Sequence, residues 1–269
     1  MAENPKEESA WHLSLGIGAG IRTNPLEFST DVPIIFLPQI EYAGKRFFIQ
    51  NLDLGLIFLE TDRQQFNLLL TPSYDQIFFN RWNVGNFFVD AHIENGFVTA
   101  NSENENGSLL EPLIKDGKFK SADEYSLHER HMTALGGIEY NFSTAEIDWQ
   151  FQWVTDVLGV HNGNEIRFSI SRYWKFSRSS LRVSAGAIWQ DKNTQNYYYG
   201  VTSEEAVTAY SLDSGISPLI RLDWNYRLTE SWDLRLFGSY RQLNDEIENS
   251  PLIEDNKIVT LFVGGVYHF

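Results

Sequence analysis

The sequence contains no cysteine and no long hydrophobic run, and it is poor in positive charge. The absence of cysteine excludes a disulfide framework and any thiol chemistry. A transmembrane helix needs about 18 apolar residues in a row, and no stretch comes near that length, so a helical membrane protein is excluded. With 21 Lys and Arg against 36 Asp and Glu, the net charge is -15. Nucleic acid is therefore not expected as a partner, because binding phosphates needs a basic face.

Aromatic residues, in contrast, make up 14% of the chain, and many lie in stretches that alternate between apolar and polar side chains. The last stretch, Ile258 to Phe269, shows the alternation most clearly. Its apolar face carries Val259, Leu261, Val263, Gly265, Tyr267 and Phe269. A soluble domain rarely ends on such a strand, whereas a closed outer-membrane barrel needs a last strand that pairs with the first and ends on an aromatic residue.

The alternation predicts an all-β fold, a closed antiparallel transmembrane β-barrel of about twelve strands. About ten strands remain if residues 32–58 or 75–95 contain a loop hairpin. The predicted strands cover residues 11–21, 32–42, 48–58, 66–74, 87–93, 132–140, 145–154, 166–174, 181–190, 220–227, 232–241 and 258–269. Pro38 fits this pattern least well, because a proline inside a sheet costs a ladder hydrogen bond.

The connections alternate in length, as in outer-membrane barrels with short periplasmic turns and long extracellular loops. Short connections are predicted at 141–143, 176–179 and 228–231, and longer ones at 155–163, 191–215 and 242–257. We expect one barrel domain over residues 1–269, with a flexible periplasmic N-terminus at 1–9 and a long extracellular loop at 95–130. The first ten residues look like the start of a mature chain whose signal peptide has been removed.

A soluble β-sandwich or lipocalin is the alternative, because both also alternate apolar and polar residues. The position of aromatic residues favours the membrane barrel, since they lie on the apolar face near strand ends, as in interfacial girdles. These residues are Trp11, Tyr42, Tyr74, Tyr140, Trp174, Trp189, Trp232 and Tyr240.

If the apolar faces meet lipid, charges of both signs point into the lumen. They are Glu139, Glu146, Asp148, Arg167, Arg182, Arg221, Asp223, Arg227, Asp233, Arg235 and Arg241. A narrow barrel would be largely filled by such pairs, which favours a closed barrel over a general porin. A substrate pathway is the alternative reading of these charges.

No residue is predicted to be catalytic or to bind a cofactor or metal. His161 precedes a strand in a way that suggests an outer-wall lipid hydrolase, but no serine lies next to it, and an Asn-Gly turn explains it better. The other candidate histidines, His12, His92 and His268, have no metal-ligand spacing. The acidic loops read as solvated surface, with binding of divalent cations or cationic peptides as an alternative.

Five strings along the chain are distinctive: IEYAGKRFFIQN, TDVLGVHNGNEI, NYYYGVTSEEA, NSPLIED and the final GGVYHF. Together they resemble the MipA/OmpV family of Gram-negative outer-membrane proteins over nearly the whole chain. The most specific piece is YYYGV-x-x-x-EA at Tyr197 to Ala206. The chain departs from the family pattern at Asn249, where the family has Asp, and in an expanded segment at 75–130.

The resemblance implies a non-enzymatic barrel in the outer membrane. Its best-known member is a scaffold that brings a lytic murein transglycosylase together with a peptidoglycan synthase, so these enzymes are the expected partners. OmpV-like members are described as surface proteins in osmotic response or adhesion. Outer-membrane lipids and lipopolysaccharide are expected around the barrel, and Phe269 is expected to signal to the barrel assembly machinery. The alternative functions are passage of small solutes or antibiotics, surface adhesion and, less favoured, lipid hydrolysis.

Overall fold

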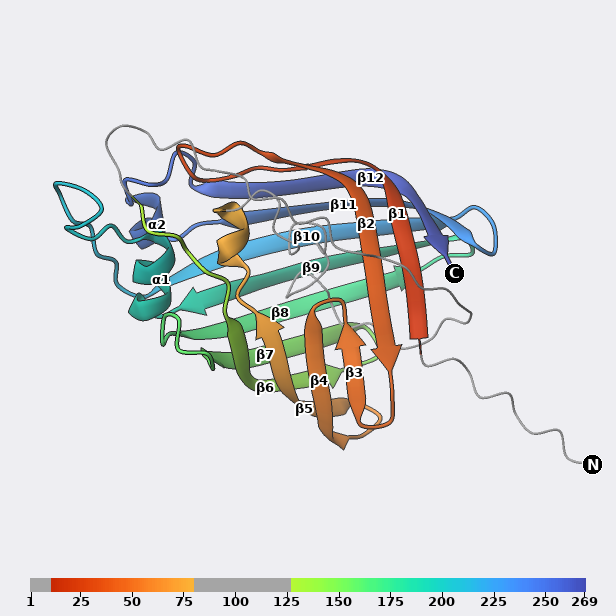
Figure 1. Ribbon diagram of the computed structural model, residues 1–269. Helices are drawn as coiled ribbons and strands as arrows, with labels where there is room; N and C mark the ends of the chain where they lie inside the picture. The colour runs from red at the N-terminus through yellow and green to blue at the C-terminus, as the bar shows by residue number, and fades with distance from the viewer. Residues whose placement is uncertain (1–10, 80–126) are drawn as a thin grey trace, which may run out of the picture.

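The computed structural model describes residues 11–79 and 127–269, which form a closed barrel of twelve antiparallel strands (Figure 1). Each strand pairs with its neighbours in the sequence, and β1 pairs with β12. No helix in these two ranges is long and apolar enough to cross a membrane. The strands are β1 (Trp11–Arg22), β2 (Val32–Ala43), β3 (Phe47–Gln50), β4 (Asp53–Glu60), β5 (Gln64–Pro72), β6 (Ala134–Ser143), β7 (Ile147–Asp156), β8 (Asn164–Lys175), β9 (Ser179–Gln190), β10 (Gly215–Arg227), β11 (Trp232–Gln242) and β12 (Lys257–His268).

The two ends of the barrel differ in their connections, as the sequence predicts. One end, the turn rim, has only the short connections 44–46, 61–63, 144–146, 176–178 and 228–231. The other end, the loop rim, has the longer connections 23–31, 157–163, 191–214 and 243–256. Three short helices lie at the loop rim: η1 (Asp75–Phe78), α1 (Lys192–Tyr199) and α2 (Asp245–Glu248).

The wall has an apolar outer face and a more polar inner face, which confirms the predicted split. On β12, Leu261 and Val263 are 52% and 48% exposed, whereas Thr260 and Phe262 are buried inside the barrel. Four of the predicted girdle aromatics are exposed on the outside: Trp11, Tyr140, Trp232 and Tyr240. Tyr74 is an exception, because the chain bends into η1 directly after it and its hydroxyl donates to Asp53 at 3.4 Å.

The seam that closes the barrel is rich in glycine. Gly18 on β1 lies opposite Gly264 on β12. The inner face of β1 carries glycine at positions 16, 18 and 20, and the ring of Phe262 lies against these residues. Phe262 also stacks on Phe237, with ring centroids 5.7 Å apart. The missing side chains of β1 therefore make room for an aromatic pair inside the barrel.

The single strand predicted over residues 48–58 is wrong. The chain reverses at Asn51 and Leu52, so that Gln50 lies opposite Asp53 in a β3–β4 hairpin. Asn51 adopts a positive φ of 54°, and its N–H donates to the carbonyl of Ile40 at 2.7 Å. Asparagine tolerates this left-handed conformation better than most residues.

The reversal escapes an alternation count because the pattern continues on both sides of the two-residue turn with its phase inverted. Leu54 and Leu56 are exposed on the outer face. A single strand over 48–58 would place Phe48 on that same face, but Phe48 packs inside the barrel against Leu69 and Leu135. A turn of two residues places the flanking residues on one face, which a continuous strand would not do.

The predicted total of twelve strands is confirmed, but its composition differs. Residues 47–60 supply two strands in place of the predicted one. The strand predicted at 87–93 lies outside the described residues, as do the N-terminal segment 1–9 and most of the predicted loop 95–130. The twelve strands of the closed barrel all lie within the described residues.

Strand β2 departs from simple alternation in its N-terminal half. A register shift against β1 inverts its phase, so that Val32 and Ile34, which alternation with Phe36 and Tyr42 would place outside, are buried inside. The backbone nitrogen and C=O of Pro38 point toward the same neighbouring strand as those of Ile40, because these groups alternate in direction along a strand. The backbone N–H and C=O of Ile40 both bond to Asn51, on the β3 side. The nitrogen of Pro38 therefore also faces the β3 side, and no hydrogen bond to β1 is lost there.

Candidate functional site: a filled lumen and an apolar plug

A chain of hydrogen-bonded side chains crosses the lumen. It begins on β6 at Glu139, which accepts a bond from Gln152 at 2.7 Å. The oxygen of Gln152 accepts from Arg167 at 3.4 Å. Arg167 donates to one oxygen of Glu165 through two nitrogens, at 2.8 and 3.1 Å. Three adjacent strands, β6, β7 and β8, are therefore linked through their inner faces.

The same series of hydrogen-bonded side chains continues to the helix η1. The amide of Gln190 on β9 donates to Glu165 at 3.3 Å and to Asp75 at 2.6 Å. Asp75 also accepts from Arg241 on β11 at 3.2 Å. Because Asp75 lies on η1, these bonds tie η1 to strands β9 and β11 and hold it across the barrel interior.

Glu139 accepts hydrogen bonds from four side-chain amides in the lumen. Its two oxygens accept from Asn67 and Asn141, both at 2.8 Å, from Gln150 at 3.0 Å and from Gln152 at 2.7 Å. A buried carboxylate without such donors would cost several kcal/mol. The four amides therefore act as a neutral cage for one charge.

A second charged group lies on β10 and β11. Arg221 donates to both oxygens of Asp223 at 2.6 Å, and Arg235 adds a bond at 3.2 Å. Both guanidinium groups lie over the ring of Phe237, at 4.8 and 5.6 Å from its centroid. A planar guanidinium stacks favourably on an aromatic face. Paired charges therefore fill the interior next to β6–β9 and again, together with an aromatic ring, next to β10 and β11.

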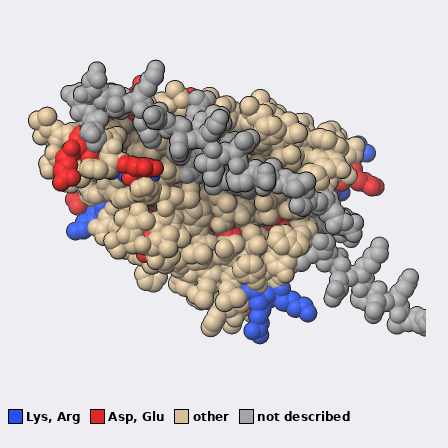
Figure 2. Space-filling model, in the orientation of Figure 1, with Lys and Arg blue, Asp and Glu red and all other residues tan. Residues whose placement is uncertain are grey.

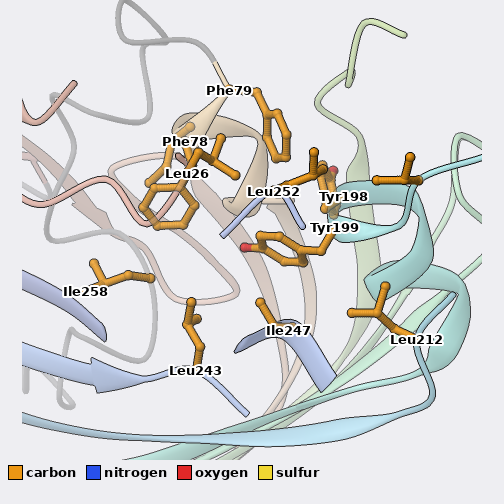
Figure 3. Close-up of a cluster of buried hydrophobic side chains, with 12 residues drawn as sticks. Leu26, Phe78, Phe79, Tyr198, Tyr199, Leu212, Leu243, Ile247, Leu252 and Ile258 are labelled. Carbon is orange, nitrogen blue, oxygen red and sulfur yellow. The ribbon is translucent and has the colours of Figure 1, made fainter. Parts of the chain in front are cut away.

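An apolar cluster, which we call the plug, covers the lumen at the loop rim (Figure 3). It consists of Leu26, Ile77, Phe78, Phe79, Tyr198, Tyr199, Val201, Leu212, Leu243, Ile247, Leu252 and Ile258. Phe79 faces the rings of Tyr198 and Tyr199, with centroids 6.2 Å away in each case. Residues from four separate connections and the start of β12 meet there, so burying apolar surface holds the loops together over the barrel mouth.

Capping residues set the position of the two helices in the plug. The side chain of Asp191 begins α1 by accepting from the N–H of Thr194 at 3.0 Å, and Asn244 caps α2 in the same way. Burial alone would raise the pKa of Asp191, but bonds from Thr194 and Asn164 outweigh it and lower that pKa. Burial raises the pKa of the Tyr199 hydroxyl, which therefore stays protonated.

The side chain of His161 contacts the backbone of its own loop and two aromatic rings. Its Nδ1 accepts from the N–H of Gly163 at 2.9 Å, and its buried ring packs 5.7 Å from the rings of Tyr197 and Tyr198. Asp156 holds the same loop, accepting from the N–H of His161 at 2.6 Å. Among the described residues, no serine hydroxyl bonds to His161. These contacts agree with the predicted Asn-Gly turn and provide no nucleophile.

Glu205 joins two distant segments at the loop rim. It accepts from Arg130 at 2.7 Å and from the backbone N–H groups of His128 and Thr202, both at 2.9 Å. Burial alone would raise the pKa of Glu205, but these bonds outweigh it and lower the pKa to about 2. The YYYGV-x-x-x-EA string therefore contributes Tyr198 and Tyr199 to the plug, and its glutamate, Glu205, joins the two segments.

The predicted lumen charges are only partly confirmed. Glu139, Arg167, Arg221, Asp223 and Arg235 are buried inside the barrel. Glu146 and Arg227 instead lie exposed at the turn rim, because Glu146 lies in the turn before β7 and Arg227 is the last residue of β10. Sequence reasoning missed Glu165 and Asp75. Glu165 had a signal, since it shares a strand face with Arg167, whereas nothing in the local sequence marked Asp75.

A scan against protein-family models matches residues 15–269 to the family described as MltA-interacting protein MipA. The chain belongs to this family. The match covers every strand of the barrel except the first residues of β1. The resemblance inferred from the five sequence strings is therefore confirmed for the chain as a whole.

Named relatives of this MipA-family chain are outer-membrane proteins. It is 23% identical to the putative outer membrane protein YiaT of Escherichia coli (strain K12), over 97% of this chain and 92% of YiaT. It is also 23% identical to the MltA-interacting protein of the same strain, over 96% of this chain and 90% of that protein. Among solved structures, the NanC porin aligns at a TM-score of 0.44 and 7% identity, covering 96% and 99% of the two chains.

The protein is thus an outer-membrane barrel of the MipA family. In such barrels the short turns face the periplasm and the long loops face outward. The turn rim is therefore periplasmic, and the loop rim with its plug is extracellular. Figure 1 places the C-terminus at the end opposite α1 and α2, which is the periplasmic end.

Proposed function

We propose that the protein is a non-enzymatic scaffold whose periplasmic side binds a lytic murein transglycosylase and, with it, a peptidoglycan synthase. The observation that carries this proposal is membership of the MipA family over residues 15–269. A relative of similar length is named MltA-interacting protein, which supports a transglycosylase as partner. The turn rim and the segment 1–9 are the candidate contact regions.

The closed interior supports a scaffold over a passage function. The chain of bonds from Glu139 to Arg241 occupies the lumen, and the plug lies above it. Solute passage, surface adhesion and lipid hydrolysis remain alternatives with less support. Hydrolysis would need a nucleophile at His161, where the described residues offer only loop backbone and tyrosine rings.

Direct binding tests the proposal. The full chain in lipid nanodiscs is exposed to a purified lytic murein transglycosylase, and binding is followed by biolayer interferometry. Saturable binding is expected, and nanodiscs that carry an unrelated barrel are the control. A variant lacking residues 1–9 separates the N-terminal segment from the rim. Equal, non-saturable signals from this protein and the unrelated barrel would contradict the scaffold role.

A further inference from the structure

Charge is distributed unequally between the two ends of the barrel. The described longer connections at the loop rim and the strand residues that adjoin them contain fourteen Asp and Glu but only four Lys and Arg, which are Arg22, Arg130, Lys192 and Lys257. At the turn rim, the turns and the strand residues that adjoin them contain six Lys and Arg and four Asp and Glu. A chain with a net charge of -15 therefore presents a locally cationic periplasmic end.

The six cations of the turn rim, which we call the cation ring, are free of ion pairs with described residues. They are Lys45, Arg46, Arg63, Lys175, Arg178 and Arg227, and all six are exposed. Of the four acids beside them, Glu146 is already paired with Arg172 at 2.9 Å. Figure 2 shows basic side chains projecting from the lower edge of the molecule, where Figure 1 places the turns below β3 and β4.

The cation ring surrounds the barrel. Lys45, Arg46 and Arg63 lie on the turns beside β3 and β4, and Lys175 and Arg178 lie on the turn between β8 and β9. Strands β3 and β9 are six positions apart in a closed barrel of twelve, which places them on opposite sides. A partner that contacts all of these cations must therefore surround the barrel.

Large apolar side chains accompany each part of the ring. Phe47 follows Arg46 and is 41% exposed, Phe176 follows Lys175 and is 57% exposed, and Leu228 follows Arg227 and is 52% exposed. A cation beside an exposed apolar group suits the boundary of a membrane, where the apolar part meets acyl chains and the charge meets headgroups.

We propose that the cation ring binds the phosphodiester headgroups of anionic phospholipids in the periplasmic leaflet. A lipid leaflet is the partner that surrounds a barrel at one level, which matches the position of cations on opposite sides. Each Lys or Arg near an anionic membrane surface increases binding about fivefold. The acidic loop rim repels such headgroups, so the preference also orients the barrel.

Fluorescence quenching tests this proposal. The full chain is reconstituted in phosphatidylcholine vesicles that contain a minor fraction of acyl-brominated phosphatidylglycerol. Bromine quenches tryptophans in contact with it, and Trp174 and Trp232 lie at the turn rim. Quenching is expected to exceed the value set by the bulk lipid fraction. In the K175Q/R178Q variant, the preference for phosphatidylglycerol over phosphatidylcholine next to the barrel is expected to fall about tenfold or more.

The matched control is K192Q/K257Q, which removes the same charge from the loop rim and should keep the enrichment. Raising the salt concentration should weaken it in the wild-type chain, because salt screens exposed charges. If K175Q/R178Q does not fold, judged by heat-modifiable gel mobility, R46Q/R63Q tests the opposite side. Quenching that follows the bulk fraction, or equal loss in the turn-rim and control variants, would overturn the proposal. Displacement of phosphatidylglycerol by inorganic phosphate at constant ionic strength would also overturn it.

Discussion

At the scale of residues, the lumen is organised by opposite charges two positions apart on one strand. Glu165 and Arg167 form such a pair on β8, and Arg221 and Asp223 form another on β10. Residues two apart share a strand face, so each pair meets without help from a distant segment. Charge-assisted hydrogen bonds of this kind offset the desolvation cost of burying each charge, which an unpaired ion in the low-dielectric interior would not recover.

The closing seam leads to a prediction at this scale. A Cβ at Gly18 would meet the carbonyl oxygen of Val263 and the Cα of Gly264, which are backbone atoms of the β1–β12 ladder. We expect G18V to lower the free energy of unfolding by about 3 kcal/mol, in the range of overpacked cores. Urea unfolding in detergent micelles measures the change.

The neighbouring residue provides the control for this substitution. Ala19 lies on the exposed outer face of the same strand, and A19V should change stability by no more than about 0.5 kcal/mol. Equal losses in the two variants would show that β-branching in β1, rather than the contact with β12, causes the effect.

At the scale of elements, short polar contacts decide where strands and loops end. Asn51 reverses the chain between β3 and β4, and Asp191 and Asn244 begin the plug helices. Each supplies an acceptor or a backbone conformation at one position only. The elements therefore depend on single residues, while the apolar patterning tolerates many substitutions.

The tie at Glu205 predicts a pH dependence. Its folded pKa of about 2 lies below the ordinary value of 4.5, so its stabilising contribution is complete above pH 4.5 and is lost as the pH falls through about 2. We expect amide hydrogen exchange at Thr202 and His128, corrected for the intrinsic rate, to accelerate over this interval. E205Q should accelerate it about tenfold at neutral pH.

The adjacent acid is the matched control for Glu205. Glu204 is exposed, and its side chain comes no nearer to His128 than 3.9 Å. E204Q should leave exchange at both amides unchanged. Equal protection in E205Q and the wild-type chain would mean that the plug, and not Glu205, holds these two segments together.

The C-terminal strand predicts a difference between assembly and stability. In the folded barrel, Phe269 contributes one backbone bond, from its N–H to the carbonyl of Leu13 at 3.1 Å, and one ring contact with Tyr267. Deleting Phe269 should therefore cost about 1–2 kcal/mol of stability. The proposed role of Phe269 as a signal to the assembly machinery predicts that its loss reduces the amount inserted in cells by several-fold. Normal membrane levels of the truncated chain would contradict this role.

At the scale of the whole molecule, the interior is divided between a charged network and an apolar plug. Both occupy the path that ions would follow. We therefore expect no stable conductance from the protein in planar bilayers, under conditions in which a general porin conducts. Discrete, reproducible channel openings would contradict the closed lumen and would favour the passage alternative.

Much of this architecture follows from local patterns. The strand faces, the alternating connection lengths and the closing role of residues 258–269 were all predictable, because a lipid-facing strand must present an apolar side chain at every second position. The paired charges of the lumen were partly predictable for the same reason. Family membership was visible in strings such as the one at Tyr197 to Ala206.

The sequence by itself thus determined the outer wall of this protein, its direction through the membrane and the acidity of its long loops. Only the tertiary structure decided the chain reversal at Asn51, the inverted phase of β2 and the position of η1 across the lumen. The plug was decided at that level too. These features depend on contacts between distant residues, such as Gln190 with Asp75, which are 115 positions apart. An alternating pattern records which face a residue occupies, but it does not record which residue it meets there.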